Sequence, residues 1–246
     1  MEVALFAEKL FSIGGLPITN TLVTTLITTS LLIIFALIVS KKVSLVPSGK
    51  AQLISEIVVE NIFSLIENLS DYKRAKRFFP IVATFFIFII VANYLGLLPG
   101  FGTIGLHQIH DGESLFVPFL RSINSDLNVT LALALISVGV THYYSVSALG
   151  IINYLKRYFS LNPVNLFVGL LEIVAEFTKI LSLSFRLFGN IFAGEALLVT
   201  ISSLFAFILP LPFMFLELIV GFVQAVIFMM LTLVFMTILT EKSVSH

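Results

Sequence analysis

The sequence of 246 residues contains no cysteine and no tryptophan, and only 11% of its residues are charged. Without cysteine the chain can form no disulfide, bind no metal through thiolates and use no thiol nucleophile. Without tryptophan, any aromatic belt at a membrane surface must consist of tyrosine or phenylalanine. The 14 basic and 14 acidic side chains give a net charge of zero, so nothing in the composition indicates nucleic-acid binding.

Hydrophobic side chains dominate the sequence instead. They make up 58% of the residues, 25 of them phenylalanine, and the mean hydropathy is +1.08. Such a composition is typical of a membrane protein, and helices are the usual way to span a bilayer. We therefore predict an all-α integral membrane protein with a single membrane domain, 1–246. Residues 1–19 lack the basic leader and apolar run of a cleaved signal peptide, so we expect them to be an outer segment of the mature protein.

Apolar runs of about 20 residues predict five hydrophobic helices. The first three spans are expected at 20–40, 79–98 and 128–149. The last two runs, 164–200 and 211–240, would be roughly 55 and 45 Å long as helices, more than the hydrocarbon core of about 30 Å requires. We expect them to form a long, strongly tilted antiparallel hairpin over 164–240.

The segment 43–77 differs from the spans, because apolar residues recur there at helical spacing among charged ones. It predicts an amphipathic helix on the membrane surface. Residues 41–77 hold half of the basic residues, whereas 99–127 hold only Arg121, so the positive-inside rule makes 41–77 cytoplasmic. Five hydrophobic segments then leave the amino terminus outside and the carboxyl terminus in the cytoplasm. The basic residues of this segment are Lys41, Lys42, Lys50, Lys73, Arg74, Lys76 and Arg77.

Ionisable groups inside the last two apolar runs are the strongest functional signal. Arg186 cannot in practice lose its charge, and a guanidinium at bilayer depth costs roughly 2.5 to 3.5 kcal/mol. Glu195, nine residues later, lies on the opposite side of the same helix, and Glu217 shares a helix face with Gln224. One polar stripe, within about 80° of the helix circumference, is formed by Glu172, Glu176, Lys179, Arg186 and Asn190.

These charges have structural interpretations as well. Arg186 could form a salt bridge with Glu172 or Glu176, and those early carboxylates could also snorkel to the cytoplasmic surface. Glu195 and Glu217 have no cation on their own face, so each is expected to be neutral part of the time or beside water.

Metal, cofactor and catalytic sites are not expected. His107 and His110 with Asp111 and Glu113 could suggest a metal site, but an exposed outer loop does not favour one. The sequence has no nucleotide-binding loop of the Walker type, so we predict no cofactor and no catalysis by this chain alone.

The segment Ser182-Leu-Ser-Phe-Arg186-Leu-Phe-Gly-Asn190-Ile-Phe-Ala-Gly-Glu195 resembles subunit a of the F-type ATP synthase, the static part of its membrane motor. The resemblance extends along most of the chain. Similar motifs are Asn93-Tyr-Leu-Gly-Leu-Leu-Pro99, Asp126-Leu-Asn-Val-Thr130, Pro163-Val-Asn-Leu166 followed by Glu172, and Gln224-Ala-Val-Ile-Phe.

The resemblance implies a stator subunit with two proton half-channels that do not meet, each leading to a rotating ring of c subunits. Arg186 would face the ring, favour the ionised form of a passing ring carboxylate and block proton leakage. The implied partners are the c-ring, peripheral-stalk b subunits, the remaining ATP synthase subunits and the lipid bilayer of a bacterial inner membrane. Glu195, Glu217, Gln224 and Asn190 would belong to the proton path, with Asn93, Asp126, Glu172 and Ser182 as further lining residues.

The hairpin offers a check on spacing. Pairing 186 with 224 and 195 with 217 puts the turn at 205 or 206 in both cases, so one register satisfies both pairs. We therefore expect Glu195 and Glu217 to approach closely enough to share protons. Three positions depart from related sequences: Glu217 stands where many have histidine, Gly96 where some have aspartate, and Ile180 where some have proline.

Two other classes compete with this interpretation. A secondary cation/proton antiporter can also use an intramembrane arginine with paired glutamates, but such proteins usually show two related halves with interrupted helices, and the sequence shows neither. A purely structural anchor explains the hydrophobicity but not polar residues at several places along one helix.

Overall fold

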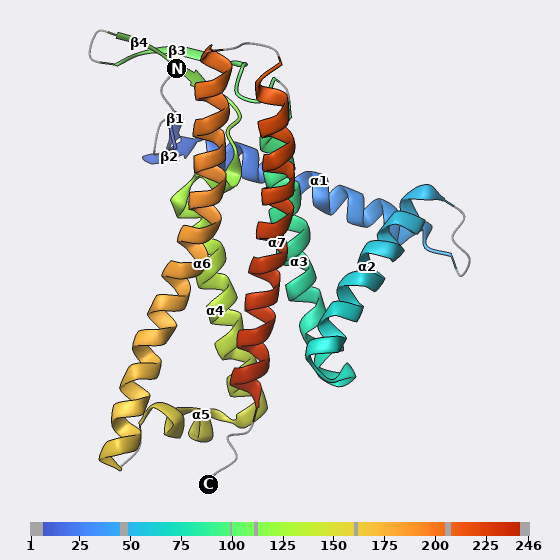
Figure 1. Cartoon of the computed structure of the whole chain (residues 1–246), viewed down its shortest axis with the longest axis vertical. Coiled ribbons are helices and arrows are strands. Elements are labelled where there is room, and N and C mark those ends of the chain that lie inside the picture. Colours follow the sequence, from blue (N-terminus) through green and yellow to red (C-terminus); the bar gives the residue numbers. More distant parts are fainter. Residues whose placement is uncertain are drawn as a thin grey trace.

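A computed structural model describes residues 7–44, 49–98, 100–110, 113–159, 162–204 and 208–241. Within them the chain is mainly helical, and the long helices form an elongated bundle (Figure 1). Two hairpins of strands lie at one end, and α5 lies at the other. The elements are β1 (Lys9–Ile13), β2 (Leu16–Thr19), α1 (Asn20–Lys42), α2 (Lys50–Leu69), α3 (Tyr72–Gly96), β3 (Gly105–His110), β4 (Glu113–Pro118), the 3-10 turn η1 (Ile123–Ser125), α4 (Leu127–Leu149), α5 (Ile151–Tyr158), α6 (Pro163–Leu204) and α7 (Pro210–Thr240).

The predicted fold class is confirmed. Four helices in the described ranges are long and apolar enough to cross a membrane: α1, α3, α4 and α7. The fifth hydrophobic run forms α6, which is not among these four. At 42 and 31 residues, α6 and α7 are about 63 and 47 Å long, so neither can stand upright within a hydrocarbon core of about 30 Å.

Two apolar clusters hold the bundle together, and α3 and α7 contribute to both. In the first, Ile66 of α2 packs with Phe78 of α3 and Leu233 of α7. In the second, Leu187 of α6 packs with Ile89 of α3 and with residues of α4 and α7. Helix α7 therefore contributes to both clusters, whereas α6 contributes to the second only.

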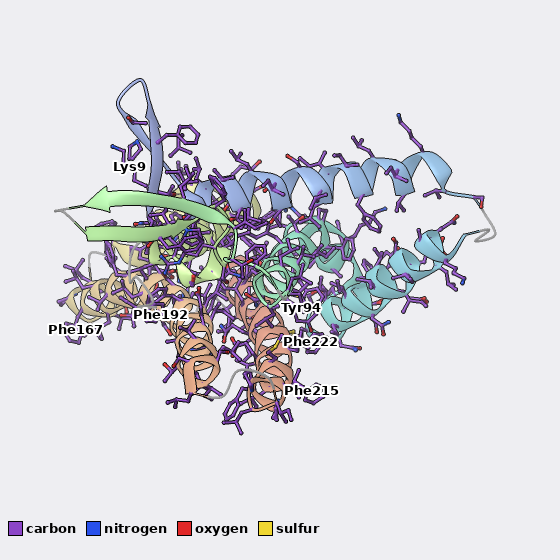
Figure 2. The ribbon with its side chains drawn as sticks, turned by 90° about the horizontal axis from the view of Figure 1, so that it is seen from above. Lys9, Tyr94, Phe167, Phe192, Phe215 and Phe222 are labelled. Atoms are coloured by element: carbon purple, nitrogen blue, oxygen red, sulfur yellow. The ribbon has the colours of Figure 1, made fainter. Side chains whose placement is uncertain are left out.

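Helix α1 is attached to the bundle mainly at its beginning. The Thr21 hydroxyl donates to Asp126 Oδ2 at 2.8 Å, and the Arg121 backbone N–H donates to Thr24 Oγ1 at 3.2 Å. Further along, α1 exposes large apolar residues such as Phe35 and Leu37. Seen from above, α1 runs away from α6 and α7, and the β1–β2 hairpin stands out from the bundle (Figure 2).

Several elements were not predicted from the sequence. The β1–β2 hairpin turns at Gly14 and Gly15, whose φ angles of 59° and 87° suit the two central positions of a type I′ turn. Short helix α5 follows Gly150, which has a φ of 81°. The segment expected to be one amphipathic unit, 43–77, is divided, because α2 ends at Leu69 and the basic residues after it begin α3.

Hydroxyl groups link α4 to its neighbours inside the apolar bundle. Ser137 Oγ and Thr232 Oγ1 are 2.8 Å apart, and Ser145 Oγ donates to the Leu239 carbonyl at 2.7 Å. Both serines are fully buried. Hydrogen bonds between membrane helices add modest stability, about 0.6 kcal/mol each on average.

We predict that replacing Ser137 and Ser145 together by alanine destabilises the chain by about 1 kcal/mol, because each interhelical bond is worth roughly 0.6 kcal/mol. Denaturant titration of the purified chain in mixed micelles measures the change. Ser30→Ala with Thr178→Ala is the matched control, since these exposed hydroxyls bond only to carbonyls of their own helices. Equal effects of the two pairs would contradict the prediction.

Candidate functional site

Arg186 lies on an exposed side of α6. Its guanidinium donates to Ser182 Oγ at 3.3 Å. In the described part of the chain, no carboxylate comes within ion-pair distance of it. A structural salt bridge to Glu172 or Glu176, the alternative that the sequence left open, is therefore not formed, and this cation is available to a group from outside the chain.

The side chains of the polar stripe of α6 contact different helices at different levels, because α6 is longer than any helix packed against it. Glu172 pairs with Arg157 of α5 at 2.8 Å. Burial lowers the pKa of Arg157, but the hydrogen bond and charge of Glu172, together with Tyr158 and Glu176, raise it above its usual value. Glu176 pairs with Lys179 at 2.8 Å and lies 3.6 Å from His142 of α4. The first turns of α6 thus form a network of ion pairs at the α5 end of the bundle.

One helical turn beyond Arg186, an amide pair joins the two long helices. Asn190 Nδ2 donates to Gln224 Oε1 at 2.6 Å, and the Gln224 side chain is buried. The pairing of 186 with 224 that the sequence suggested is thus displaced by one turn, to 190 with 224. The turn of the hairpin falls between Leu204 and Pro210, which agrees with the predicted position.

Glu195 and Glu217 line the same cavity, near a point where α6 and α7 approach closely. The carboxyl group of Glu217 packs directly on Gly194, where any side chain would overlap with it. One oxygen of each carboxyl group, Glu195 Oε2 and Glu217 Oε1, is buried without a hydrogen-bond partner among the described residues. An unsatisfied buried polar atom costs about 1 to 3 kcal/mol, so each of these oxygens requires a water molecule or a proton.

A cavity of about 540 Å³ adjoins these two carboxyl groups. Asn93 of α3, Glu195, Ser202 and Ser203 of α6, and Glu217 of α7 line it, together with residues near the β-hairpins. Its lining by Ser202 and Ser203, near the turn between α6 and α7, places it at the end of the hairpin opposite α5, so it can give water access to Glu195 and Glu217 from that end.

Asn93 is held by two hydrogen bonds inside the bundle. It accepts from Asn124 Nδ2 at 2.7 Å and donates to the Gly221 carbonyl at 2.9 Å. The side chain therefore connects η1, α3 and α7 beside the cavity. The departure at Gly96 has a steric explanation, because a side chain there would approach Ser122 Oγ to 2.8 Å.

Asp126 stabilises the beginning of α4 and links it to α1. Oδ1 accepts from the Asn128 backbone N–H at 2.9 Å and caps α4, while Oδ2 accepts from Thr21. Its place in the proton path stays a prediction, as does that of Glu172.

Sequence reasoning did not identify Glu8 and Arg121, which also line the cavity. A signal for Arg121 was present, because it begins the polar run 121–126 directly before a span. The side chains of His107, His110, Asp111 and Glu113 lie outside the described residues. Elsewhere in the described chain, no group of three or more histidine, aspartate or glutamate side chains could hold a metal ion.

Comparison with known proteins agrees with this geometry. Residues 22–237 match the family described as ATP synthase A chain. The chain belongs to this family. ATP synthase subunit a 1 of Hahella chejuensis is 36% identical over 223 residues, covering 91% of this chain and 85% of that protein. ATP synthase subunit a of Moorella thermoacetica is 31% identical over 227 residues, covering 92% and 93%.

A third relative, ATP synthase subunit a of Legionella pneumophila, is 32% identical over 234 residues, covering 95% of this chain and 92% of that protein. The chain is therefore a proton-translocating stator subunit of an F-type ATP synthase, not catalytic by itself, and a multi-pass protein of a bacterial membrane. Neither comparison supports the antiporter alternative.

We predict that Gly194→Ala nearly abolishes proton pumping, because the new methyl group must displace the Glu217 carboxyl group. ATP-driven acidification of inverted membrane vesicles measures it. Gly139→Ala of α4 is the matched control, since a Cβ there meets nothing within 4 Å and this residue is not on the helix that carries Arg186. Similar activity of the two variants would contradict the close contact between Gly194 and Glu217.

We predict that Asp126→Ala lowers stability by about 1 to 2 kcal/mol through loss of the helix cap and of the bond to Thr21. Asp126→Asn should keep both stability and pumping, because the amide oxygen can still cap α4. Thermal denaturation of the purified complex and vesicle acidification measure the two effects. A correctly assembled Asp126→Asn complex that does not pump would instead support proton transfer by Asp126.

Proposed function

We propose that Arg186 faces a ring of small rotor subunits and separates two offset half-channels, each of which exchanges protons with a carboxylate of the ring. The observation that carries the proposal is a permanent cation on an exposed apolar surface with no acidic partner in the described chain. The adjacent Phe185 is 53% exposed, and Leu197, three turns further along the face of Arg186, is 42% exposed.

Contact between lipid and the surface around Arg186 is unfavourable. A guanidinium facing hydrocarbon costs roughly 2.5 to 3.5 kcal/mol, and a hydrogen bond to a serine hydroxyl cannot neutralise the charge. A carboxylate from a partner helix removes this cost. Since α6 is already packed against α4 and α7 on its other side, the partner must approach from the exposed side, as a ring would.

The two half-channels are proposed on opposite sides of this cation. The outer one comprises the cavity, Glu195 and Glu217, and reaches the ring past Asn190 and Gln224. The inner one runs along α6 towards α5, past Ser182 and Glu172. Because the two paths do not join, a proton can pass from one to the other only on a ring carboxylate, which must lose it to pass Arg186. Proton flow would then drive rotation.

The orientation with a cytoplasmic carboxyl terminus is supported by the basic residues. Arg74, at the beginning of α3, forms an ion pair with Glu241, directly after α7, at 3.3 Å. Lys156 and Arg157 lie in α5 at the same end of the bundle (Figure 1). Basic side chains gather on the cytoplasmic side of membrane proteins, which in bacteria is the inner face of the plasma membrane.

The b subunits of the peripheral stalk are the second partner proposed. If α6 binds the ring, the stalk must bind elsewhere. Helices α1 and α2 provide an apolar surface for it, since Ile33 and Phe35 of α1 and Ile54 of α2 are each at least half exposed.

We predict that Arg186→Ala abolishes ATP-driven acidification of inverted vesicles and increases passive proton leak, because both the ring contact and the barrier are lost. The control is Arg74→Ala, which removes an exposed arginine at the cytoplasmic end and should pump normally. The amount of assembled complex is measured in the same membranes. Normal pumping by Arg186→Ala would refute the proposed role of this residue.

A further inference from the structure

The amino-terminal segment contributes a carboxyl group to the cavity. Glu8, directly before β1, lines the cavity together with Glu195 and Glu217. Three carboxyl groups from three separate parts of the chain therefore face one space. Glu195 and Glu217 lie deep between α6 and α7, whereas Glu8 lies outside the spanning helices and is half-buried.

Glu8 is held in place by Asn20, the first residue of α1. Asn20 Nδ2 donates to Glu8 Oε2 at 3.3 Å, and the Asn20 backbone N–H donates to the Glu8 carbonyl at 3.1 Å. Asn20 is itself fully buried. Two bonds to a buried residue fix both the backbone and the side chain of Glu8, so the carboxyl group has a defined position at the cavity.

The charges around Glu8 come from other elements. Burial raises its pKa most, Arg121 before η1 opposes that rise, and Glu195 of α6 adds to it. Glu217 of α7 lies beyond Glu195 in the same cavity, and the neighbouring Lys9 is exposed. The net rise in pKa means that Glu8 keeps its proton to a higher pH than an ordinary glutamate, as a group that collects protons from dilute solution requires.

We infer that Glu8 is the outermost proton-binding group of the outer half-channel, taking protons from the outside solution and passing them through cavity water to Glu195 and Glu217. In each transfer, the Glu8 carboxyl group gives its proton to a water molecule, which gives one to the Glu195 carboxylate, and the solution then reprotonates Glu8. This role rests on the proposed function. It assigns the amino-terminal segment to the proton path.

A structural role is the competing explanation, since Glu8 also ties the amino-terminal segment to α1. Glu8→Gln separates the two. Its amide oxygen can still accept from Asn20, but it carries no proton at any accessible pH. Glu8→Asp remains titratable. The control is Glu67→Gln, the same change at an exposed glutamate of α2 that does not line the cavity.

The experiment uses the whole complex in liposomes with the ATP-forming part outside, so that the lumen corresponds to the outer side. ATP synthesis is driven by a fixed potassium diffusion potential while lumenal pH is varied. At high lumenal pH we expect Glu8→Gln to lose about tenfold in rate, less than the roughly 100-fold that removing a positioned proton-transfer group can cause, because water still reaches the cavity.

The loss should shrink as the lumen is acidified, because abundant protons can reach Glu195 directly. Glu8→Asp should recover part of the rate, and Glu67→Gln should match the unmodified complex. A rate for Glu8→Gln that is unchanged, or lowered equally at every pH, would overturn the inference. If Arg186→Ala is inactive while Glu8→Gln is normal, only this inference fails. If Arg186→Ala pumps normally, the proposed function itself fails.

Discussion

The fixed positive charge of Arg186 is the constraint on which the arrangement of the last two helices depends. A guanidinium on an apolar surface is tolerable only if its helix cannot rotate to another environment. Buried residues on the other side of α6, Leu183, Leu187 and Ile191, provide that restraint by packing into the cluster shared with α3, α4 and α7. The exposed charge and the buried apolar stripe are thus two consequences of one helix orientation.

The same packing explains how two carboxyl groups can lie between apolar helices. Gly194 lets α6 approach α7 so closely that the Glu217 carboxyl group occupies the volume of a missing side chain. That contact leaves one oxygen of each glutamate without a partner in the described chain, and the adjoining cavity can supply water. Helices α6 and α7 thus pack closely at Gly194 although water can reach the two carboxyl groups beside it. If the two helices were further apart, water could continue between them towards Arg186.

Much of this site could be predicted from the sequence, because it depends on helical periodicity. The nine-residue spacing from Arg186 to Glu195 put them on opposite sides of one helix, and the pairing with Glu217 gave the position of the turn. Glu8 and Asn124 could not be found in this way, since loops and strands bring them to the site from distant parts of the chain. The partner of Glu172, Arg157, was missed for a related reason: α5 has only eight residues and no signal of a membrane span.

The cavity also defines where the proposed outer path narrows. Its lining includes Ile191, Glu195 and Glu217 but neither Asn190 nor Gln224, whose amides bond to each other at 2.6 Å. Neutral amides can hydrogen-bond a passing proton carrier but cannot hold the proton themselves. In the proposed path, a proton leaving Glu195 or Glu217 therefore has no titratable side chain among the described residues of the hairpin to bind before the ring. Arg186, one turn further, repels it from continuing along α6. In the proposed path, transfer to a ring carboxylate at this level is then the favourable route, and the amide pair would keep cavity water from making a continuous path past the arginine.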